Sequence, residues 1–138
     1  MVRQQNKDLS DEQKDILFNH ATEAPFSGSL LHNEEDGSYH CANCDNVVFG
    51  SETKFDSGSG WPSFYDVRTL SAVHLKEDRS LGMQRVEVTC GSCGAHLGHV
   101  FNDAIDQPTG MRFCINSLAL QFKPNPAAGP TTTEQNKS

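Results

Sequence analysis

The sequence is poor in basic residues and contains no long apolar run. Its 138 residues include 11 Lys and Arg against 18 Asp and Glu, which gives a formal net charge of −7. Binding of nucleic acid through phosphate contacts needs clustered Lys and Arg, so the composition argues against that function. No apolar stretch approaches the roughly 18 residues of a membrane-spanning helix. We therefore expect neither nucleic acid nor membrane as a partner.

Apolar residues and tryptophan are also scarce. Hydrophobic residues make up 36% of the chain, which has a single Trp and a mean hydropathy of −0.55. A chain of this length suggests one domain with a modest core, which a structural metal would help to hold together. The segment 1–5 is polar and does not open a secretory signal. We expect a single cytoplasmic domain that acts as a monomer.

Cysteines are few, but their spacing is the strongest signal in the chain. Four of the five lie in two CxxC segments, Cys41–Cys44 and Cys90–Cys93. Two such pairs are typical of a four-cysteine zinc site, because the two-residue spacing lets one tight turn aim both sulfurs at a tetrahedral ion. The alternatives are a redox-active dithiol and an iron–sulfur centre, but Gly91 and Gly94 favour a turn over a helix start. The odd count fits a reducing compartment.

Local patterns predict one short helix followed by strands. Segment 10–13 has the residues of a capping box and predicts a helix through about His20, with Ile16, Leu17 and Ala21 as its apolar stripe. Short apolar runs bounded by Gly, Asn, Asp and Ser then predict an all-β domain. The predicted strands cover 38–41, 46–49, 72–75, 84–90, 111–116 and 117–122. Residues 123–138 lack periodicity and are expected to be a disordered tail.

The fifth cysteine, Cys114, has no cysteine partner once a metal takes the other four. Residues two apart share a face of a strand, so Arg112, Cys114 and Asn116 point one way. Phe113 and Ile115 then point toward the core. A neighbouring cation such as Arg112 favours the thiolate. A lone cysteine is more often inert and half-buried, but these polar neighbours make Cys114 a candidate nucleophile.

Three further segments favour a site around this thiol. His96 and His99 directly follow the second CxxC and are core histidines, metal ligands or proton donors. The glycine-rich turn 57–64 carries Trp61, and such a turn is either a surface corner or a pocket for a small apolar group. The turn 106–110 leads into the strand of the fifth cysteine.

Together these motifs resemble the methionine sulfoxide reductases of the B type. The motifs are CxxC, SGSGWPSF, CGSCGAHLGHVFND, PTGMRFCINS and LALQF, and the similarity runs from about Thr22 to Phe122. The resemblance implies a mainly β domain over residues 8–122, with antiparallel strands in two small, barrel-like sheets and one structural zinc that joins two knuckles. It also implies reduction of the R epimer of methionine sulfoxide, free or in proteins, as in protein repair after oxidative stress.

The resemblance implies a role for each site residue. Cys114 would attack the sulfoxide sulfur, leaving methionine and a sulfenic acid. His96, His99 and Asn116 would bind and protonate the sulfoxide oxygen. Arg112 would help to activate the thiol, Asp103 would support the histidines, and Trp61 with Phe113 would frame the substrate methyl group. The implied zinc ligands are Cys41, Cys44, Cys90 and Cys93. The role of Phe113 conflicts with the strand alternation, which turns its ring away from the thiol.

Ser59 departs from the commoner pattern of this family. Many members have Cys in its place, and that cysteine resolves the sulfenic acid as an internal disulfide. Ser59 cannot do so, which implies an external reductant: a thioredoxin-like protein, glutathione with glutaredoxin, or a small thiol. The alternative is a binding module with two zinc knuckles and no catalysis. Such a module would not need a free thiol beside two histidines and a tryptophan.

Overall fold

Antiparallel strands form most of the regular structure. The computed structural model describes residues 8–79, 82 and 84–125. The strands are β1 (Gly37–Cys41), β2 (Val47–Gly50), β3 (Lys54–Phe55), β4 (Ser63–Phe64), β5 (Val73–Asp78), β6 (Arg85–Cys90), β7 (His96–Phe101), β8 (Arg112–Ile115) and β9 (Leu120–Pro124). They form a three-stranded sheet in the order β2-β1-β9 and a six-stranded sheet in the order β3-β4-β8-β7-β6-β5. The expected mainly β fold with two antiparallel sheets is confirmed.

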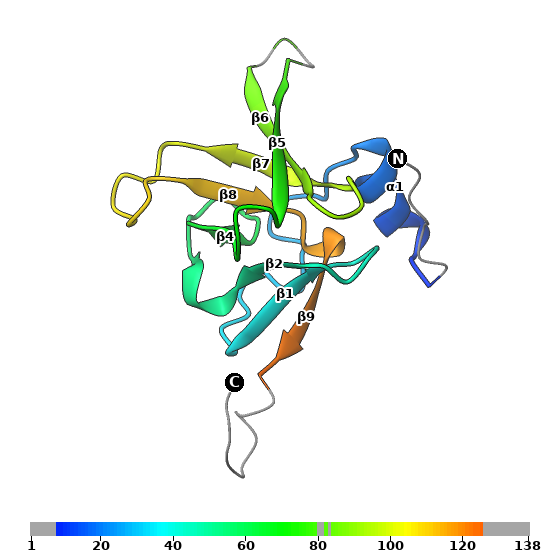
Figure 1. Ribbon diagram of the computed structural model, residues 1–138, viewed down its shortest axis with the longest axis horizontal. Helices are drawn as coiled ribbons and strands as arrows, with labels where there is room; N and C mark the ends of the chain where they lie inside the picture. The colour runs from blue at the N-terminus through cyan, green and yellow to red at the C-terminus, as the bar shows by residue number, and fades with distance from the viewer. Residues whose placement is uncertain (1–7, 80–81, 83, 126–138) are drawn as a thin grey trace.

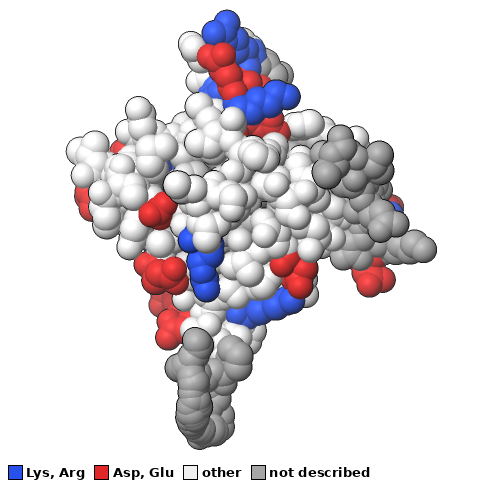
Figure 2. Space-filling model, in the orientation of Figure 1, with Lys and Arg blue, Asp and Glu red and all other residues white. Residues whose placement is uncertain are grey.

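Figure 1 shows how the helix and the strands are arranged in space. The hairpin β5–β6 projects from the body, and the helix lies at the opposite side from the β7–β8 turn. On the face drawn in Figure 2, charged side chains of both signs gather at the end of this hairpin, where Arg79 pairs with Glu77. Within the described residues, no helix is long and apolar enough to cross a membrane.

Helix α1 (Asp11–Asn19) has defined local signals at both ends. The Ser10 hydroxyl accepts a hydrogen bond from the Gln13 amide at 3.1 Å, and the Gln13 side chain accepts one from the Ser10 amide at 2.9 Å. This reciprocal pair is the predicted capping box. The helix ends at Asn19, and the C-cap residue His20 takes a left-handed conformation with φ 62°. Ile16 and Leu17 are buried and hold the helix against the sheet.

The sequence predicted most strands but not all of them. The central strand β7 was considered only as part of a site, because its polar and glycine-containing sequence lacks a clear alternation. The last predicted strand begins later than residue 117, since Ser117–Ala119 form the short 3-10 helix η3; another, η1, covers Ser51–Thr53. Strand β9 continues through Pro124, past the predicted domain end at 122. Residues 126–138 of the predicted tail lie outside the described residues.

Aromatic side chains from the two sheets meet in the core. Tyr39 and Phe49 of the small sheet lie 5.0 and 4.3 Å from the Phe64 ring of the large sheet, measured between ring centroids. The Phe113 ring of β8 lies 5.7 Å from that of Phe49. Aromatic pairs of this kind contribute about 0.5–1.5 kcal/mol beyond the burial of their area. This packing fixes β8, the strand that carries Cys114, against the small sheet.

Replacing Phe64 should therefore destabilise the whole domain. Phe64 is fully buried between Tyr39 and Phe49. We expect Phe64→Ala to lower the free energy of unfolding by about 3–5 kcal/mol, because it leaves a cavity that the two sheets cannot close. Urea unfolding followed by circular dichroism measures the change. Leu70→Ala is the control, since Leu70 is 94% exposed; equal losses in both variants would contradict the core described above.

Candidate active site and metal centre

Cys114 lies on the wall of a cavity of about 330 Å³. Strands β6, β7 and β8 and the turn before β4 contribute to this wall. The polar lining residues are Thr22, Ser59, Arg85, His99, Arg112 and Asn116, and Trp61, Gly98 and Phe101 complete the wall. A volume of this size is at the lower end of small-molecule pockets and suits a single side chain or a small amino acid.

Strand pairing places Cys114 between His99 and Ser63. In the strand register, Cys114 pairs with His99 on β7 and with Ser63 on β4. Gly98 allows β7 to approach β8 closely, because a Cβ atom at this position would overlap the backbone carbonyl of Cys114. The glycine between the two histidines is thus a packing requirement of the site. The predicted alternation of β8 is confirmed, since Phe113 and Ile115 lie in the core while Cys114 faces the cavity.

Arg112 connects Cys114 to a carboxylate. Its Nη1 donates to the Cys114 sulfur at 2.7 Å, and its Nε and Nη2 donate to the two Asp103 carboxylate oxygens, each at 2.9 Å. These hydrogen bonds hold the pKa of the Asp103 carboxyl below its usual value. A guanidinium held in this way keeps a fixed positive charge beside the sulfur. Asp103 was expected to support the histidines; in the structure it contacts Arg112 instead.

The two predicted histidines occupy different positions. His99 lines the cavity, and its Nε2 lies 2.8 Å from the Asp78 carboxylate. His96 lies behind the cavity wall, where its Nδ1 is 2.8 Å from a Glu87 oxygen that also contacts His20 at 3.0 Å. Burial lowers the pKa of His96 and outweighs the opposing effect of Glu87. The structure therefore brings His99, but not His96, to the thiol.

Two serine hydroxyls contact the sulfur on the side of the glycine-rich turn, and a third contacts both of them. The Ser59 and Ser63 oxygens lie 3.4 and 3.7 Å from the Cys114 sulfur. Ser57 joins them, with its hydroxyl 2.8 Å from that of Ser59 and 2.7 Å from that of Ser63. These hydroxyls can donate hydrogen bonds to a thiolate. Of the two serines that contact the sulfur, Ser59 is the nearer.

Asn116 and Trp61 hold the cavity wall through backbone contacts. The Asn116 side chain accepts from the Glu23 amide and donates to the Leu97 carbonyl, both at 3.0 Å. The Trp61 indole donates to the Glu23 carbonyl at 3.0 Å. These bonds tie the segment after α1 to the sheet and fix the orientation of the Trp61 ring. The aromatic side chain that lines the cavity with Trp61 is Phe101, a residue that the sequence analysis missed.

The four remaining cysteines meet at two identical turns. Cys41 ends β1 and Cys90 ends β6, and each following turn closes with a residue of left-handed backbone, Asp45 with φ 71° and Gly94 with φ 78°. The sulfur of Cys41 lies 3.7 Å from that of Cys93. The corresponding distance from Cys44 to Cys90 is 3.5 Å. A tetrahedral ion with metal–sulfur bonds of about 2.3 Å needs sulfurs about 3.8 Å apart, so this set fits one metal ion.

Proton affinities in this cluster differ because the thiols share hydrogen bonds. Bonds from neighbouring thiols lower the pKa of Cys90, while the matching bonds raise that of Cys41. Burial raises the pKa of Cys44 to about 11. Four adjacent thiols cannot all ionise unless a cation offsets their charge. The sulfur distances therefore fit a bound metal ion, and the four sulfurs can ionise together only if that ion offsets their charge.

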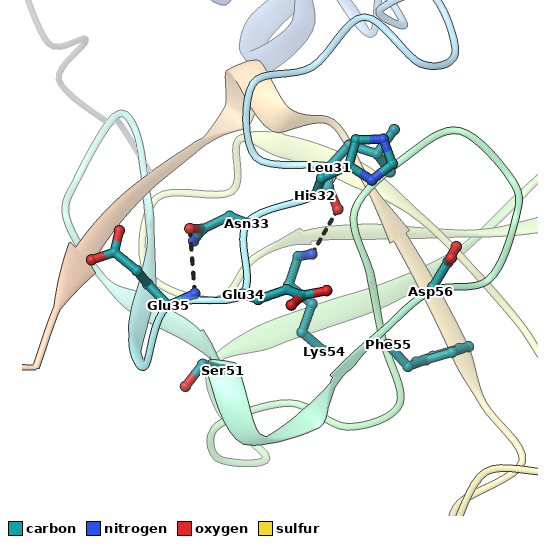
Figure 3. A pocket seen from close by; sticks show the side chains of 9 residues that line it. All are labelled: Leu31, His32, Asn33, Glu34, Glu35, Ser51, Lys54, Phe55 and Asp56. Carbon is teal, nitrogen blue, oxygen red and sulfur yellow. Dashed lines mark hydrogen bonds between the residues drawn. The ribbon is translucent and has the colours of Figure 1, made fainter.

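A second hollow lies on another part of the surface. It has a volume of about 300 Å³ and is lined by three carboxylates and by Lys54. Figure 3 shows the Lys54 side chain extended toward the Leu31 carbonyl, to which it donates at 2.7 Å. Burial lowers the pKa of Lys54. No cysteine lines this hollow, and it shares no lining residue with the cavity of Cys114. The hydrogen bond of Lys54 joins segment 31–35 to β3.

Comparison with known proteins agrees with this geometry. The model of the SelR domain family matches residues 9–124. The chain is also similar to the peptide methionine sulfoxide reductase MsrB of Escherichia coli strains O45:K1 (S88) and K12 (DH10B). Each is 54% identical over 116 residues, which cover 84% of this chain and 84% of the relative. The region that the SelR model matches, residues 9–124, includes all nine strands of the described residues.

Loss of one ligand should remove the metal and unfold the domain. We expect Cys93→Ser to bind less than one metal ion per chain and to lose more than about 3 kcal/mol of unfolding free energy, because binding of a structural metal is coupled to folding. Elemental analysis and urea unfolding measure the two effects. Cys114→Ser is the matched control and should keep its metal. Full metal content in Cys93→Ser would contradict the four-cysteine site.

Proposed function

The chain belongs to the SelR-domain family of peptide methionine sulfoxide reductases, and we propose that it reduces the R epimer of methionine sulfoxide with Cys114 as the nucleophile. The observation that carries this proposal is the Arg112 guanidinium 2.7 Å from the Cys114 sulfur, inside a cavity that His99 also lines. A thiolate beside a fixed cation and an imidazole is the arrangement that sulfoxide reduction requires. Both protein-bound and free methionine sulfoxide are proposed substrates.

In the proposed reaction the Cys114 thiolate attacks the sulfoxide sulfur. A sulfoxide is a poor electrophile until its oxygen gains a proton. We assign proton donation to His99, since an imidazole can supply a proton near neutral pH. The oxygen passes to the cysteine, so the sulfoxide is reduced by two electrons to the thioether while Cys114 is oxidised to a sulfenic acid. Arg112 stabilises the thiolate before attack, and Asp103 holds Arg112.

The other site residues are assigned supporting roles. Asn116 and His96 are proposed to shape the polar side of the site, His96 from behind the cavity wall through its contact with His99, whose ring centroid lies 5.4 Å away. Trp61 and Phe101 are proposed to frame the substrate methyl group. Phe113 packs in the core against Phe49, so its proposed contribution is to hold β8.

Regeneration of Cys114 is proposed to need an external thiol. Ser59 is nearer to the sulfur than the other serine that contacts it, Ser63, and carries no thiol of its own. The other four cysteines are grouped as metal ligands, and we propose that the metal is a structural zinc held by Cys41, Cys44, Cys90 and Cys93. A thioredoxin-like protein, glutaredoxin with glutathione, or a small thiol can attack the sulfenic acid. We propose a monomer in a reducing compartment, where such thiols are available.

A single-turnover experiment tests the reaction and its stereochemistry together. Without added reductant, we expect one equivalent of methionine per chain from the R epimer of an N-acetylated methionine sulfoxide and none from the S epimer, because Cys114 is not regenerated. A sulfenic-acid probe located by mass spectrometry should mark Cys114. Cys114→Ser should give no product while keeping its metal and fold. Turnover by Cys114→Ser would exclude the mechanism, and inactivity of folded, metal-loaded protein would favour a binding module.

A second prediction concerns position 59. Because the Ser59 oxygen lies 3.4 Å from the Cys114 sulfur, a cysteine there would place its own sulfur next to that of Cys114. We expect Ser59→Cys to form a 59–114 disulfide after one turnover, seen by mass spectrometry of the oxidised protein. Ser57→Cys is the control, since the Ser57 hydroxyl contacts Ser59 and Ser63. A sulfenic acid that persists in Ser59→Cys would show that the two positions do not meet during the reaction.

A further inference from the structure

Two basic side chains line the cavity of Cys114, and each also contacts a carboxylate that is not part of the lining, Asp78 or Asp103. These side chains are Arg85 and Arg112, and no Asp or Glu of the described residues lines the cavity. The whole chain has a formal net charge of −7. Cavities lined by charges of one sign concentrate ligands of the opposite sign. The proposed reaction accounts for one of the two arginines and leaves the other without a role.

The two arginines differ in how strongly the protein engages them. Arg112 has three short hydrogen bonds, to Asp103 and to the Cys114 sulfur. Arg85 has one long contact, from its Nη2 to the Asp78 carboxylate at 3.4 Å. The same Asp78 oxygen lies 2.8 Å from His99, so its shorter hydrogen bond is with the histidine.

The Arg85 side chain therefore presents unused donors. Its Nε atom is buried and has no hydrogen-bond partner within the described part of the chain. The side chain as a whole is 23% exposed and lines the cavity, so a carboxylate there can approach the terminal Nη1 and Nη2, which can bind both of its oxygens at once. A buried donor without a partner is unusual in a folded protein and calls for an explanation. A ligand carboxylate at the terminal nitrogens would supply the charged partner that the long contact to Asp78 does not fully provide.

Strand geometry places this guanidinium within reach of a substrate on Cys114. The pairs Val86–Val100 and Phe101–Arg112 put Arg85 in the same cross-strand row as Phe101 and Arg112. Cys114 lies in the adjacent row on β8. With strands about 4.8 Å apart and alternate residues about 6.8 Å apart, the backbones of Arg85 and Cys114 are separated by about 12 Å. The two side chains and a methionine sulfoxide can bridge that gap.

We propose that Arg85 binds a carboxylate of the substrate while Cys114 reacts with its sulfoxide sulfur. The carboxylate is either the α-carboxylate of the oxidised methionine or the side chain of an acidic residue beside it in a peptide. This inference rests on the proposed function and adds a preference for anionic substrates. The competing explanation gives Arg85 only a structural role, in which it orients Asp78 and His99.

Matched substrates separate these two explanations. We compare the R epimers of N-acetylmethionine sulfoxide, which carries a carboxylate, and of its uncharged amide. The wild-type protein should show a kcat/KM about tenfold higher for the acid, as expected for a charge-assisted hydrogen bond. Arg85→Ala should bring this ratio close to one, mainly by raising KM for the acid, and Arg85→Lys should restore part of it.

The ratio of kcat/KM for the acid to that for the amide distinguishes the two explanations even if Arg85→Ala lowers the overall activity. A purely structural role of Arg85 would lower kcat/KM for acid and amide alike and leave the ratio unchanged, which would overturn the proposal. Arg79→Ala is the matched control, because Arg79 is on the same hairpin with a side chain that is 71% exposed. Its ratio should equal that of the wild type.

The source of the carboxylate is tested with two amidated tripeptides that place Asp or Asn after the oxidised methionine. Preference for the Asp peptide that is lost in Arg85→Ala identifies the neighbouring side chain as the source. Preference for the free α-carboxylate alone identifies the main chain. Absence of both preferences in the wild type would overturn the proposal.

A binding measurement keeps the inference testable without turnover and without a variant. We expect wild-type protein to bind N-acetylmethionine about tenfold more tightly than its amide in calorimetry, with a difference that shrinks at high salt. Equal affinities would overturn the carboxylate site. If the protein reduces neither sulfoxide but still discriminates between these two unreactive ligands, the proposed function fails while the carboxylate site stands.

Discussion

The close pairing of β7 with β8 is the constraint on which the site depends. Gly98 permits this approach, because any side chain there would overlap the backbone of Cys114. The pairing then sets two neighbouring rows on one face of the sheet, with His99 opposite Cys114 and Phe101 opposite Arg112. Thiol, cation, imidazole and aromatic ring are thereby fixed by backbone hydrogen bonds. A site built on paired strands is held more rigidly than one built on loops.

The metal centre and the aromatic core hold the two sheets together at different places. Cys41 ends a strand of the small sheet and Cys90 ends a strand of the large one, so one ion bound between them joins the sheets. The core joins the sheets through Phe49, Phe64 and Phe113. Since the apolar content is only 36%, an ion bound by these cysteines would supplement a small core. Neither the four-cysteine cluster nor the aromatic core includes Cys114. The groups that join the two sheets are therefore distinct from the proposed nucleophile.

Local signals were predictable from the sequence and long-range contacts were not. The capping box, the CxxC turns and the alternation around Cys114 are each set by a few consecutive residues, and the structure has them where expected. Asp78, Arg85 and Glu87 were missed because they reach the site only through the pairing of β5, β6 and β7. Asp103 was assigned to the histidines for the same reason. Its partner, Arg112, lies across a turn whose shape no local motif specifies.

The burial of Cys114 restricts how its oxidised form can be reduced. The residue is only 8% exposed, and the serine hydroxyls cover the side of the sulfur that a resolving cysteine would otherwise occupy. In the mechanism that we propose, an external thiol therefore enters through the cavity that the substrate has just left. Reduction then has to follow product release, because both reactions use the same opening. A small thiol, or a cysteine on a protruding loop, fits this route better than a thiol on a flat surface.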